Sequence, residues 1–178
     1  YHDAILGRFA ETSELVGLCD INPGRVKLSQ DRARAKNGRT IPGYAAADFD
    51  KMITEAKPDA VIVTTVESFH HEYICRSLEL GVDAISEKPM TNQAEWCRRV
   101  LETIRKTGRR LRVTFNYRYS PPRTQVKDLL MSGVIGDILS VDFHWMLNTS
   151  HGTDYFRRWH SQKKFSNGLM CHKATHPF

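Results

Sequence analysis

A glutamate, a lysine and a proline stand together where a predicted buried strand ends. The apolar run Val82 to Ile85 leads through Ser86 into Glu87-Lys88-Pro89. Open α/β sheets bind ligands outside the carboxyl ends of their strands, so this lysine lies where a ligand is expected. The X-Pro bond at this point can be cis, which would fix the direction of the lysine. The pattern predicts that chemistry takes place at Lys88.

Short apolar runs alternate with longer helical patterns and predict an α/β fold. The runs cover residues 15–20, 60–65, 82–85 and 111–115. They are apolar throughout rather than alternating, which indicates strands that are buried on both faces of a parallel sheet. One intervening helix is expected to end at Gly81, and another to begin with Thr91 as its cap and to end at Gly108. Residues 1–118 are therefore predicted to form a doubly wound, dinucleotide-binding domain.

Asp20 ends the first of these runs. In dinucleotide-binding folds an acidic residue about 20 positions after the glycine-rich turn binds the adenosine ribose hydroxyls. A carboxylate there repels the additional phosphate of NADP, so Asp20 favours NAD as the cofactor and makes NADP the less favoured one. The same side chain could instead begin the turn at Asn22-Pro23-Gly24, or do both.

The glycine-rich loop itself is not found, because no G-x-G-x-x-G motif occurs in the sequence. Residues 1–9 resemble the helix that follows such a loop, with His2, Ile5, Leu6 and Phe9 on one face. The chain also has no initiator methionine. We expect the first strand and the phosphate-binding loop to lie upstream of Tyr1.

Composition excludes several other classes of protein. The net charge is +6, but the basic residues are spread in pairs such as Arg98-Arg99, without the dense run or aromatic motif of a nucleic-acid-binding protein. No apolar run approaches the length of a membrane span. The cysteines Cys19, Cys75, Cys97 and Cys171 have no C-x-x-C spacing, so reduced thiols in the cytoplasm are expected. A signal peptide upstream of Tyr1 is the alternative location signal.

Several motifs in a fixed order resemble the Gfo/Idh/MocA oxidoreductases, the group of glucose-fructose oxidoreductase and inositol dehydrogenase. They are Cys19-Asp20-Ile21-Asn22-Pro23, Pro58-Asp59-Ala60-Val61, Thr64-Thr65 followed by His70, Glu87-Lys88-Pro89, Asn116-Tyr117-Arg118 and residues 168–176. The resemblance implies a Rossmann domain followed by an α/β domain with a large, open, mostly antiparallel sheet. Residues 119–178 would be the start of that second domain. Its sheet would carry the substrate and join the subunits of a homo-oligomer, a dimer or a tetramer.

The resemblance also implies contacts with the cofactor. Glu87 is expected to help organise the cofactor pocket. Thr64, Thr65 and His70 would belong to a loop that passes under the cofactor, in which Thr65-Val66-Glu67 replaces the usual Thr-Pro-Asn. His70 could equally be a helix N-terminal residue without a ligand.

Lys88 is implied to be the acid-base group. Oxidation of a secondary alcohol sends a hydride to the nicotinamide and a proton to a base within hydrogen-bond reach of the hydroxyl. Partial desolvation and the neighbouring cationic nicotinamide would lower the pKa of the lysine amine enough for proton transfer near neutral pH. The alternative is a surface lysine in a turn that leads into a helix.

The predicted second domain carries candidate substrate contacts. Residues 138–147 alternate as the first strand of the open sheet. Residues 151–160 are dense in aromatic rings and hydrogen-bond donors, of which Tyr155, Arg158 and Trp159 are the candidates. Such a mixture suits a sugar or cyclitol, whose apolar ring face packs on aromatic rings while its hydroxyls take directed hydrogen bonds. An ordinary solvated loop is an equal alternative.

Residues 168–176 place His172, Lys173 and His176 close together on a predicted helix. In many family members an aspartate four residues before the histidine relays the proton and binds the hydroxyl, and here His172 occupies the aspartate position. The proton acceptor is therefore Lys88, His176 or both. We expect no metal, because the His-x-x-x-His pair has no further ligands nearby in sequence. A structural helix bearing two histidines is the remaining alternative.

Together these features predict an NAD-dependent dehydrogenase. It would oxidise or reduce a secondary hydroxyl or keto group of a sugar, sugar derivative or cyclitol. One alternative is a redox-assisted glycoside-cleaving enzyme that holds its NAD tightly. Another is a non-catalytic ligand-binding relative, against which the intact Lys88 argues. Fold alone does not separate these functions.

Overall fold

The computed structural model describes residues 1–176. The chain divides into two compact units, of which the first comprises residues 1–61 and 80–82 and the second residues 62–79 and 83 onward. The division passes through strand β3 (Ala60–Val63). No helix among the described residues is both long enough and apolar enough to cross a bilayer.

The first unit consists of helices around a two-stranded parallel sheet. Its elements are α1 (His2–Ile5), β1 (Leu18–Asp20), α2 (Pro23–Asn37), β2 (Gly43–Ala45), the short 3-10 helix η1 (Ala46–Asp48) and α3 (Phe49–Ala56). A side chain at Gly43 is not tolerated, because a Cβ there would come within 2.3 Å of the Cγ1 carbon of Val26 on α2. The glycine therefore lets the helix lie close against the strand.

The core of the first unit is small. Leu6, Ala33 and Ile41 are buried, with Leu15 and Leu18 packed against them. The helix predicted over residues 1–9 extends only to Ile5, and turns follow it. Glycine at position 7 disfavours continuation of the helix, and its N–H bonds to the Ala4 carbonyl instead, three residues back. Phe9, predicted on the same helix face as His2, Ile5 and Leu6, lies beyond the helix and is exposed.

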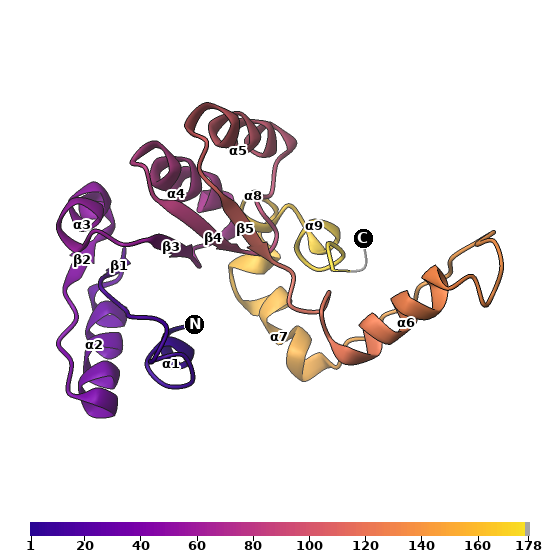
Figure 1. Ribbon diagram of the computed structural model, residues 1–178, viewed down its shortest axis with the longest axis horizontal. Helices are drawn as coiled ribbons and strands as arrows, with labels where there is room; N and C mark the ends of the chain where they lie inside the picture. Colours follow the sequence, from indigo (N-terminus) through magenta and orange to yellow (C-terminus); the bar gives the residue numbers. More distant parts are fainter. Residues whose placement is uncertain (177–178) are drawn as a thin grey trace. The chain divides into compact units, whose positions relative to one another are not determined.

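The second unit is built on parallel strands with helices packed against them. Its elements are the end of β3, then α4 (Glu67–Glu79), β4 (Asp83–Glu87), α5 (Ala94–Thr107), β5 (Leu111–Thr114), α6 (Pro121–Met131), α7 (Thr149–Arg157), the 3-10 helix η2 (Trp159–Ser161), α8 (Lys163–Ser166) and α9 (Leu169–His172). The sheet order is β3-β4-β5, and Ala84 on β4 lies opposite Leu111 on β5 in parallel register. Helices α4 and α5 lie side by side next to these strands (Figure 1). The predicted α/β class with parallel strands is confirmed.

The predicted strands are present with shifted ends, and one predicted helix cap is wrong. Helix α5 begins at Ala94 after Gln93, not after Thr91, whose buried hydroxyl has no hydrogen-bond partner among the described residues. The residues before α5 are used for a tertiary contact instead. The Asn92 side-chain amide donates to the carbonyl oxygens of Lys164 and Phe165 and so fastens α8 to this segment. The predicted end of α5 at Gly108 is confirmed by its left-handed conformation, with a φ of 67°.

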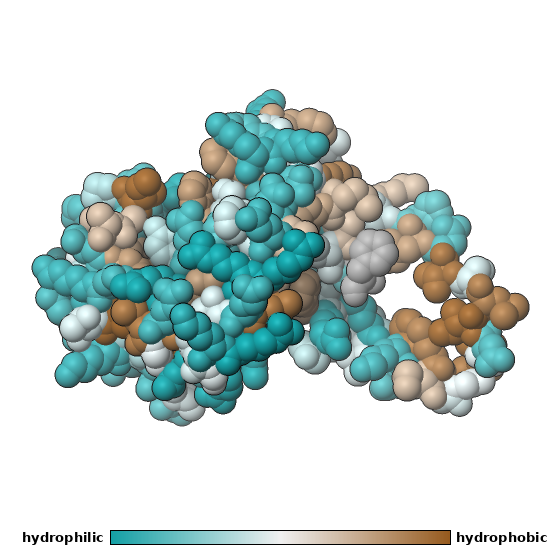
Figure 2. Space-filling view, turned by 90° about the horizontal axis from the view of Figure 1, so that it is seen from above, coloured by the Kyte–Doolittle hydropathy of each residue, from teal (hydrophilic) through white to brown (hydrophobic). Residues whose placement is uncertain are grey.

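The strand predicted over residues 138–147 is also wrong. These residues form no regular secondary structure, and Leu139 is 94% exposed. A strand needs a neighbour to pair its backbone groups, and the described residues supply none beside this segment. Helix α6, which precedes it, buries no residue. Figure 2 shows the apolar side chains of this region as brown surface at the α6 end of the molecule. The large antiparallel sheet is therefore not seen.

The contact between α4 and α5 forms the core of the second unit and yields a stability prediction. Ile74 on α4 is fully buried, whereas Leu101 on α5 is about half exposed. Replacing Ile74 by Ala should lower the free energy of unfolding by about 2–5 kcal/mol, because it leaves a cavity in the core. Leu101→Ala should cost about 1 kcal/mol or less. Urea unfolding of the full-length protein, followed by circular dichroism, measures both, and equal losses would contradict this assignment of the core.

Candidate functional site

Lys88 stands directly after the carboxyl end of β4, and its bond to Pro89 is cis. Its Nζ donates a hydrogen bond to the backbone carbonyl oxygen of His172 at 3.0 Å. Its backbone N–H donates to the Glu87 carboxylate at 3.1 Å. Burial lowers the pKa of Lys88, while the Glu87 charge opposes this shift. The structure therefore gives the lysine the partial desolvation that acid-base chemistry requires.

His172 lies at the end of α9 and brings a second titratable group to Lys88. Its Nδ1 contacts Oε1 of Glu67, the first residue of α4. Both side chains are buried, with Glu67 2% exposed and His172 9% exposed. Burial lowers the pKa of His172 to about 4, and Lys173 and His176 shift it in the same direction. The imidazole of His172 is therefore neutral at neutral pH.

Aromatic rings from the segment after α6 surround His172. The ring centroid of Tyr155 lies 5.3 Å from that of His172, and the Trp159 centroid lies 6.0 Å from it, both edge-on. His160 lies closer, at 4.7 Å, and stacks on Trp159 at 3.7 Å. The predicted substrate contacts Tyr155 and Trp159 are thus brought to His172 although they are more than ten residues away in the sequence.

Lys173 and His176 form the other side of this cluster. Lys173 Nζ lies 4.5 Å from the ring centroid of Trp145, and His176 lies 4.5 Å from that of Tyr117. Burial lowers the pKa of Lys173, with the charge of Lys88 acting in the same direction. Burial and the charges of Lys88 and Lys173 lower the pKa of His176 to about 4. Several groups that would be cations in water are held here with reduced basicity.

The prediction that one helix carries both His172 and His176 is wrong. Helix α9 ends at His172, and His176 lies in the turn that follows. The His176 N–H donates to the Lys173 carbonyl oxygen at 3.3 Å. The two histidines therefore do not share a helix face. The helix ends just before Lys173. The Lys173 side chain packs on the rings of Trp145 and Tyr117 in a cation–π contact, which favours the end of the helix at this point.

Arg158 is the predicted substrate residue that the structure does not bring to this cluster. Its side chain is exposed and pairs with Asp154 at 3.0 Å, four residues earlier. A role for Arg158 in substrate binding stays a prediction. Among residues 1–176, no group of three or more His, Cys, Asp and Glu side chains is placed to hold a metal ion.

His70 connects the loop after β3 to the lysine motif. Its Nε2 lies 3.0 Å from the Thr65 carbonyl oxygen, and its Nδ1 lies 2.9 Å from the Pro89 carbonyl oxygen. Burial lowers the pKa of His70. A neutral imidazole has one N–H, so His70 donates to one of these two carbonyl oxygens, and its ring lies between the loop after β3 and the Lys88-Pro89 peptide. Thr64 and Thr65 are exposed, and the contacts predicted between these residues and a cofactor remain predictions.

Asp20 lies in the first unit at the end of β1. Its Oδ1 accepts the Asn22 N–H at 2.7 Å, so the predicted role in the turn is confirmed. Its Oδ2 lies 3.8 Å from Nη1 of Arg25 on α2. The carboxylate keeps partly exposed oxygen surface at the strand end, which is the placement that ribose hydroxyls require. The ribose contact itself stays a prediction.

Two residues of the cluster with titratable side chains beside His172, Glu67 and His160, were not predicted from the sequence. The signal for Glu67 was the replacement of the usual Thr-Pro-Asn by Thr65-Val66-Glu67, together with a histidine in place of the usual aspartate at position 172. A carboxylate is gained at one position and lost at the other, and the structure places these two side chains in contact. His160 has a buried Nδ1 without a hydrogen-bond partner among the described residues. Only its place in an aromatic-rich segment pointed to it.

Parallel strands, an acidic residue at the end of β1 and a desolvated lysine at the end of β4 are typical of a dinucleotide-binding oxidoreductase domain. The family model described as "Oxidoreductase family, NAD-binding Rossmann fold" matches residues 1–115. The companion model described as "Oxidoreductase family, C-terminal alpha/beta domain" matches residues 127–178. The chain therefore belongs to the Gfo/Idh/MocA family of oxidoreductases, which confirms the resemblance and the NAD-binding class of its first domain.

Individual relatives extend this result. YteT of Bacillus subtilis, named as an oxidoreductase, is 38% identical over 174 residues, which are 98% of this chain and 40% of YteT. Glycosyl hydrolase family 109 protein 1 of Akkermansia muciniphila is 28% identical over 171 residues, or 91% of this chain and 36% of that protein. The structure of scyllo-inositol dehydrogenase from Lactobacillus casei with NAD(H) and scyllo-inositol is 25% identical with a TM-score of 0.65, and the match covers 77% of this chain and 38% of that one. The chain thus spans well under half the length of these relatives.

The lowered pKa values of the two histidines predict a pH dependence of stability. Each titrates near 4 in the folded protein, against about 6.5 for an unperturbed histidine. The unfolded chain therefore binds these protons first, and stability should fall as the pH drops from about 6.5 to about 4. His176→Phe keeps a ring against Tyr117 but binds no proton, so it should reduce that fall.

The measurement is the urea midpoint of the full-length protein and of the His176→Phe variant across this pH range. Parallel curves for the two proteins would show that His176 titrates normally in the fold.

Proposed function

We propose that the protein is an NAD-dependent oxidoreductase that acts on a secondary hydroxyl or keto group of a sugar, a sugar derivative or a cyclitol. The observation that carries the proposal is Lys88, desolvated at the end of β4 and hydrogen-bonded through Nζ to the His172 carbonyl oxygen. Aromatic rings and neutral imidazoles beside it suit a polyhydroxylated ring. The sugar and cyclitol classes are supported by the family and by the scyllo-inositol bound to the Lactobacillus casei relative.

Bound NAD would supply the hydride acceptor. In the oxidative direction the C–H bond of the carbinol carbon breaks, and its electron pair leaves with the hydride. The O–H bond breaks as well, and its proton passes to the neutral amine of Lys88, directly or through His176. The His172 carbonyl oxygen, which lies within hydrogen-bond distance of Lys88 Nζ, would then accept a hydrogen bond from the resulting ammonium. The products are a ketone, NADH and one proton.

We assign the cofactor to residues 1–118 and the substrate contacts mainly to residues 119–178. The extents of the two family matches support this division. Within the first part, Asp20, Thr64, Thr65, His70, Glu87 and Lys88 are the proposed cofactor-side residues. A homo-oligomer formed through the C-terminal domain completes the proposal, and light scattering of the full-length protein tests it.

A second function has support from the glycosyl hydrolase family 109 relative. In such a reaction transient oxidation at one carbon would acidify the neighbouring C–H bond and permit elimination of the leaving group together with a proton. Water would then add to the new C=C bond, and the hydride would return to the ketone. No NADH accumulates in that case. A nitrophenyl glycoside distinguishes the two functions, because nitrophenol release without NADH supports cleavage, whereas NADH accumulation with myo-inositol or a methyl glucoside supports the dehydrogenase.

Substitution of Lys88 tests the proton-transfer role. Lys88→Ala in the full-length protein should bind NAD nearly normally but lower kcat by about 100-fold or more, the usual scale for a positioned acid-base group. Lys88→Arg should not restore turnover, because a guanidinium keeps its proton. Steady-state kinetics with the substrate found above and calorimetry with NAD give the two readouts.

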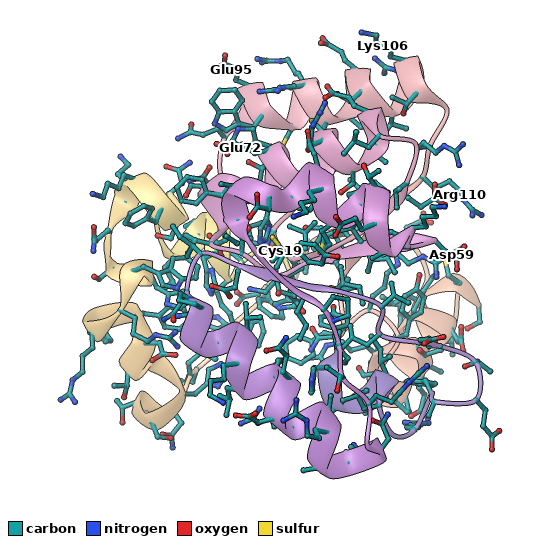
Figure 3. The ribbon with its side chains drawn as sticks, turned by 90° about the vertical axis from the view of Figure 1, so that its left-hand side faces the viewer. Cys19, Asp59, Glu72, Glu95, Lys106 and Arg110 are labelled. Carbon is teal, nitrogen blue, oxygen red and sulfur yellow. The ribbon has the colours of Figure 1, made fainter. Side chains whose placement is uncertain are left out.

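The matched control is Lys106→Ala, since Lys106 is an exposed lysine near the end of α5 (Figure 3). It should leave kcat unchanged. Retained turnover in Lys88→Ala, or full activity in Lys88→Arg, would overturn the assignment.

Substitution of Asp20 tests the cofactor preference. Asp20→Ala should weaken NAD binding by about 10- to 100-fold, because charge-assisted hydrogen bonds to the ribose hydroxyls are lost. It should also improve NADP relative to NAD, since the Arg25 guanidinium beside the carboxylate becomes available to a phosphate. Calorimetry with each dinucleotide measures both effects.

Asp31→Ala is the control, because Asp31 is an exposed carboxylate on α2 that pairs with Lys27. It should change neither affinity. Preference of the unmodified protein for NADP would show that the interpretation of Asp20 is wrong.

A further inference from the structure

A buried carboxylate touches the candidate site and has no part in the function described so far. Glu67 opens α4, is 2% exposed, and contacts Nδ1 of His172 through Oε1. Its other oxygen, Oε2, has no hydrogen-bond partner among the described residues. Burial of a carboxylate is costly unless a partner compensates it. His172 is that partner, and the contact joins residues 105 positions apart in the sequence.

The contact constrains the tautomer of His172. A neutral imidazole carries a single N–H, on Nδ1 or on Nε2, and the nitrogen without the proton is an acceptor. A carboxylate oxygen beside Nδ1 accepts a hydrogen bond and so favours the tautomer with the proton on Nδ1. The lone pair then lies on Nε2, for which no hydrogen-bond partner is found within residues 1–176.

The surroundings of His172 keep it in this neutral form. Burial lowers its pKa, and Lys173, its neighbour in sequence, and His176 shift the pKa in the same direction, while Lys88 Nζ donates to its backbone carbonyl oxygen. His160 and Tyr155 face the ring from the side. Among the described residues in contact with the ring, Glu67 is the carboxylate, and its oxygen lies beside Nδ1.

We propose that Glu67 is a positioning residue, whose carboxylate holds His172 in the Nδ1–H tautomer and thereby directs the Nε2 lone pair to a substrate hydroxyl other than the one that gives its proton to Lys88. Glu67 does not touch the substrate in this arrangement. It acts through His172, much as a buried aspartate orients the histidine of a hydrolytic triad. The inference rests on the proposed function, because it assigns an acceptor for a second hydroxyl of the substrate in that same site.

The tautomer can be measured without any turnover. In the full-length protein labelled with ¹⁵N-histidine, the nitrogen chemical shifts of His172, assigned by their loss in His172→Ala, report which ring nitrogen carries the proton. We expect Nδ1 to be protonated at pH 7 in the absence of substrate and NAD. An Nε2-protonated or doubly protonated ring in the unmodified protein would overturn the proposal, whether or not Glu67→Gln folds.

The coupling between the two residues is tested by a double-mutant cycle. Glu67→Gln should lower kcat by at least about 10-fold with little change in NAD affinity, since loss of the carboxylate that fixes a catalytic histidine tautomer costs up to about 10⁴-fold in a hydrolytic triad. In the His172→Ala background the same substitution should change kcat less than about 2-fold, because the residue that transmits its effect is gone. Independent effects that multiply in the double variant would overturn the proposal.

The matched control is Glu72→Gln, the same substitution on the same helix at a side chain that is 54% exposed (Figure 3). It should change neither kcat nor the histidine shifts. The two parts of the assignment fail separately. If Lys88→Ala retained turnover while His172 was Nδ1-protonated, the proposed function would fail and the tautomer assignment would stand. If Lys88→Ala was inactive and Glu67→Gln was fully active, the role of Glu67 alone would fail.

Discussion

The hydrogen bond from Lys88 Nζ to the His172 carbonyl oxygen is the interaction on which the candidate site depends. It joins the carboxyl end of a parallel strand to a short helix 84 residues later, and it does so with a backbone acceptor, which no substitution of the histidine side chain removes. The lysine is thereby drawn into a partly desolvated position, and desolvation lowers its pKa. The burial of Lys88 at the strand end and its lowered pKa therefore go together with this one contact.

Burial of several basic groups in one place sets the electrostatic character of this cluster. Lys88, Lys173 and His176 each lower the basicity of a neighbour, so the cluster favours neutral side chains. Neutral amines and imidazoles are acceptors, whereas their protonated forms only donate. The aromatic rings of Tyr117 and Trp145 stabilise the ammonium of Lys173 through their faces without adding a carboxylate. Glu67 is the exception, and its contact with His172 gives one imidazole a defined orientation of its proton.

Two side chains near the start of α4, Glu67 and His70, connect this helix to the lysine motif after β4 and to α9. The His70 ring lies between the Thr65 and Pro89 carbonyl oxygens, each within hydrogen-bond distance of one ring nitrogen. Three residues earlier on the same helix, Glu67 contacts His172. Helix α4 therefore holds both sides of the cluster, the lysine motif and α9, through two side chains near its first turn. The close packing of α4 against α5 and β4 keeps that turn in place.

The sequence by itself determined the local elements, the family and the lysine. Apolar runs predicted the strands, Gly108 predicted the end of α5, and Glu87-Lys88-Pro89 predicted the position of Lys88, because each depends on residues close together in the chain. Tertiary structure decided the rest. Helix α5 begins later than predicted, because the Asn92 side chain bonds to α8. The strand expected over residues 138–147 does not form, because no described strand lies beside it to pair with. The contact between Glu67 and His172 joins positions 105 residues apart, and a one-dimensional pattern carries no information about such a distance until the chain is folded.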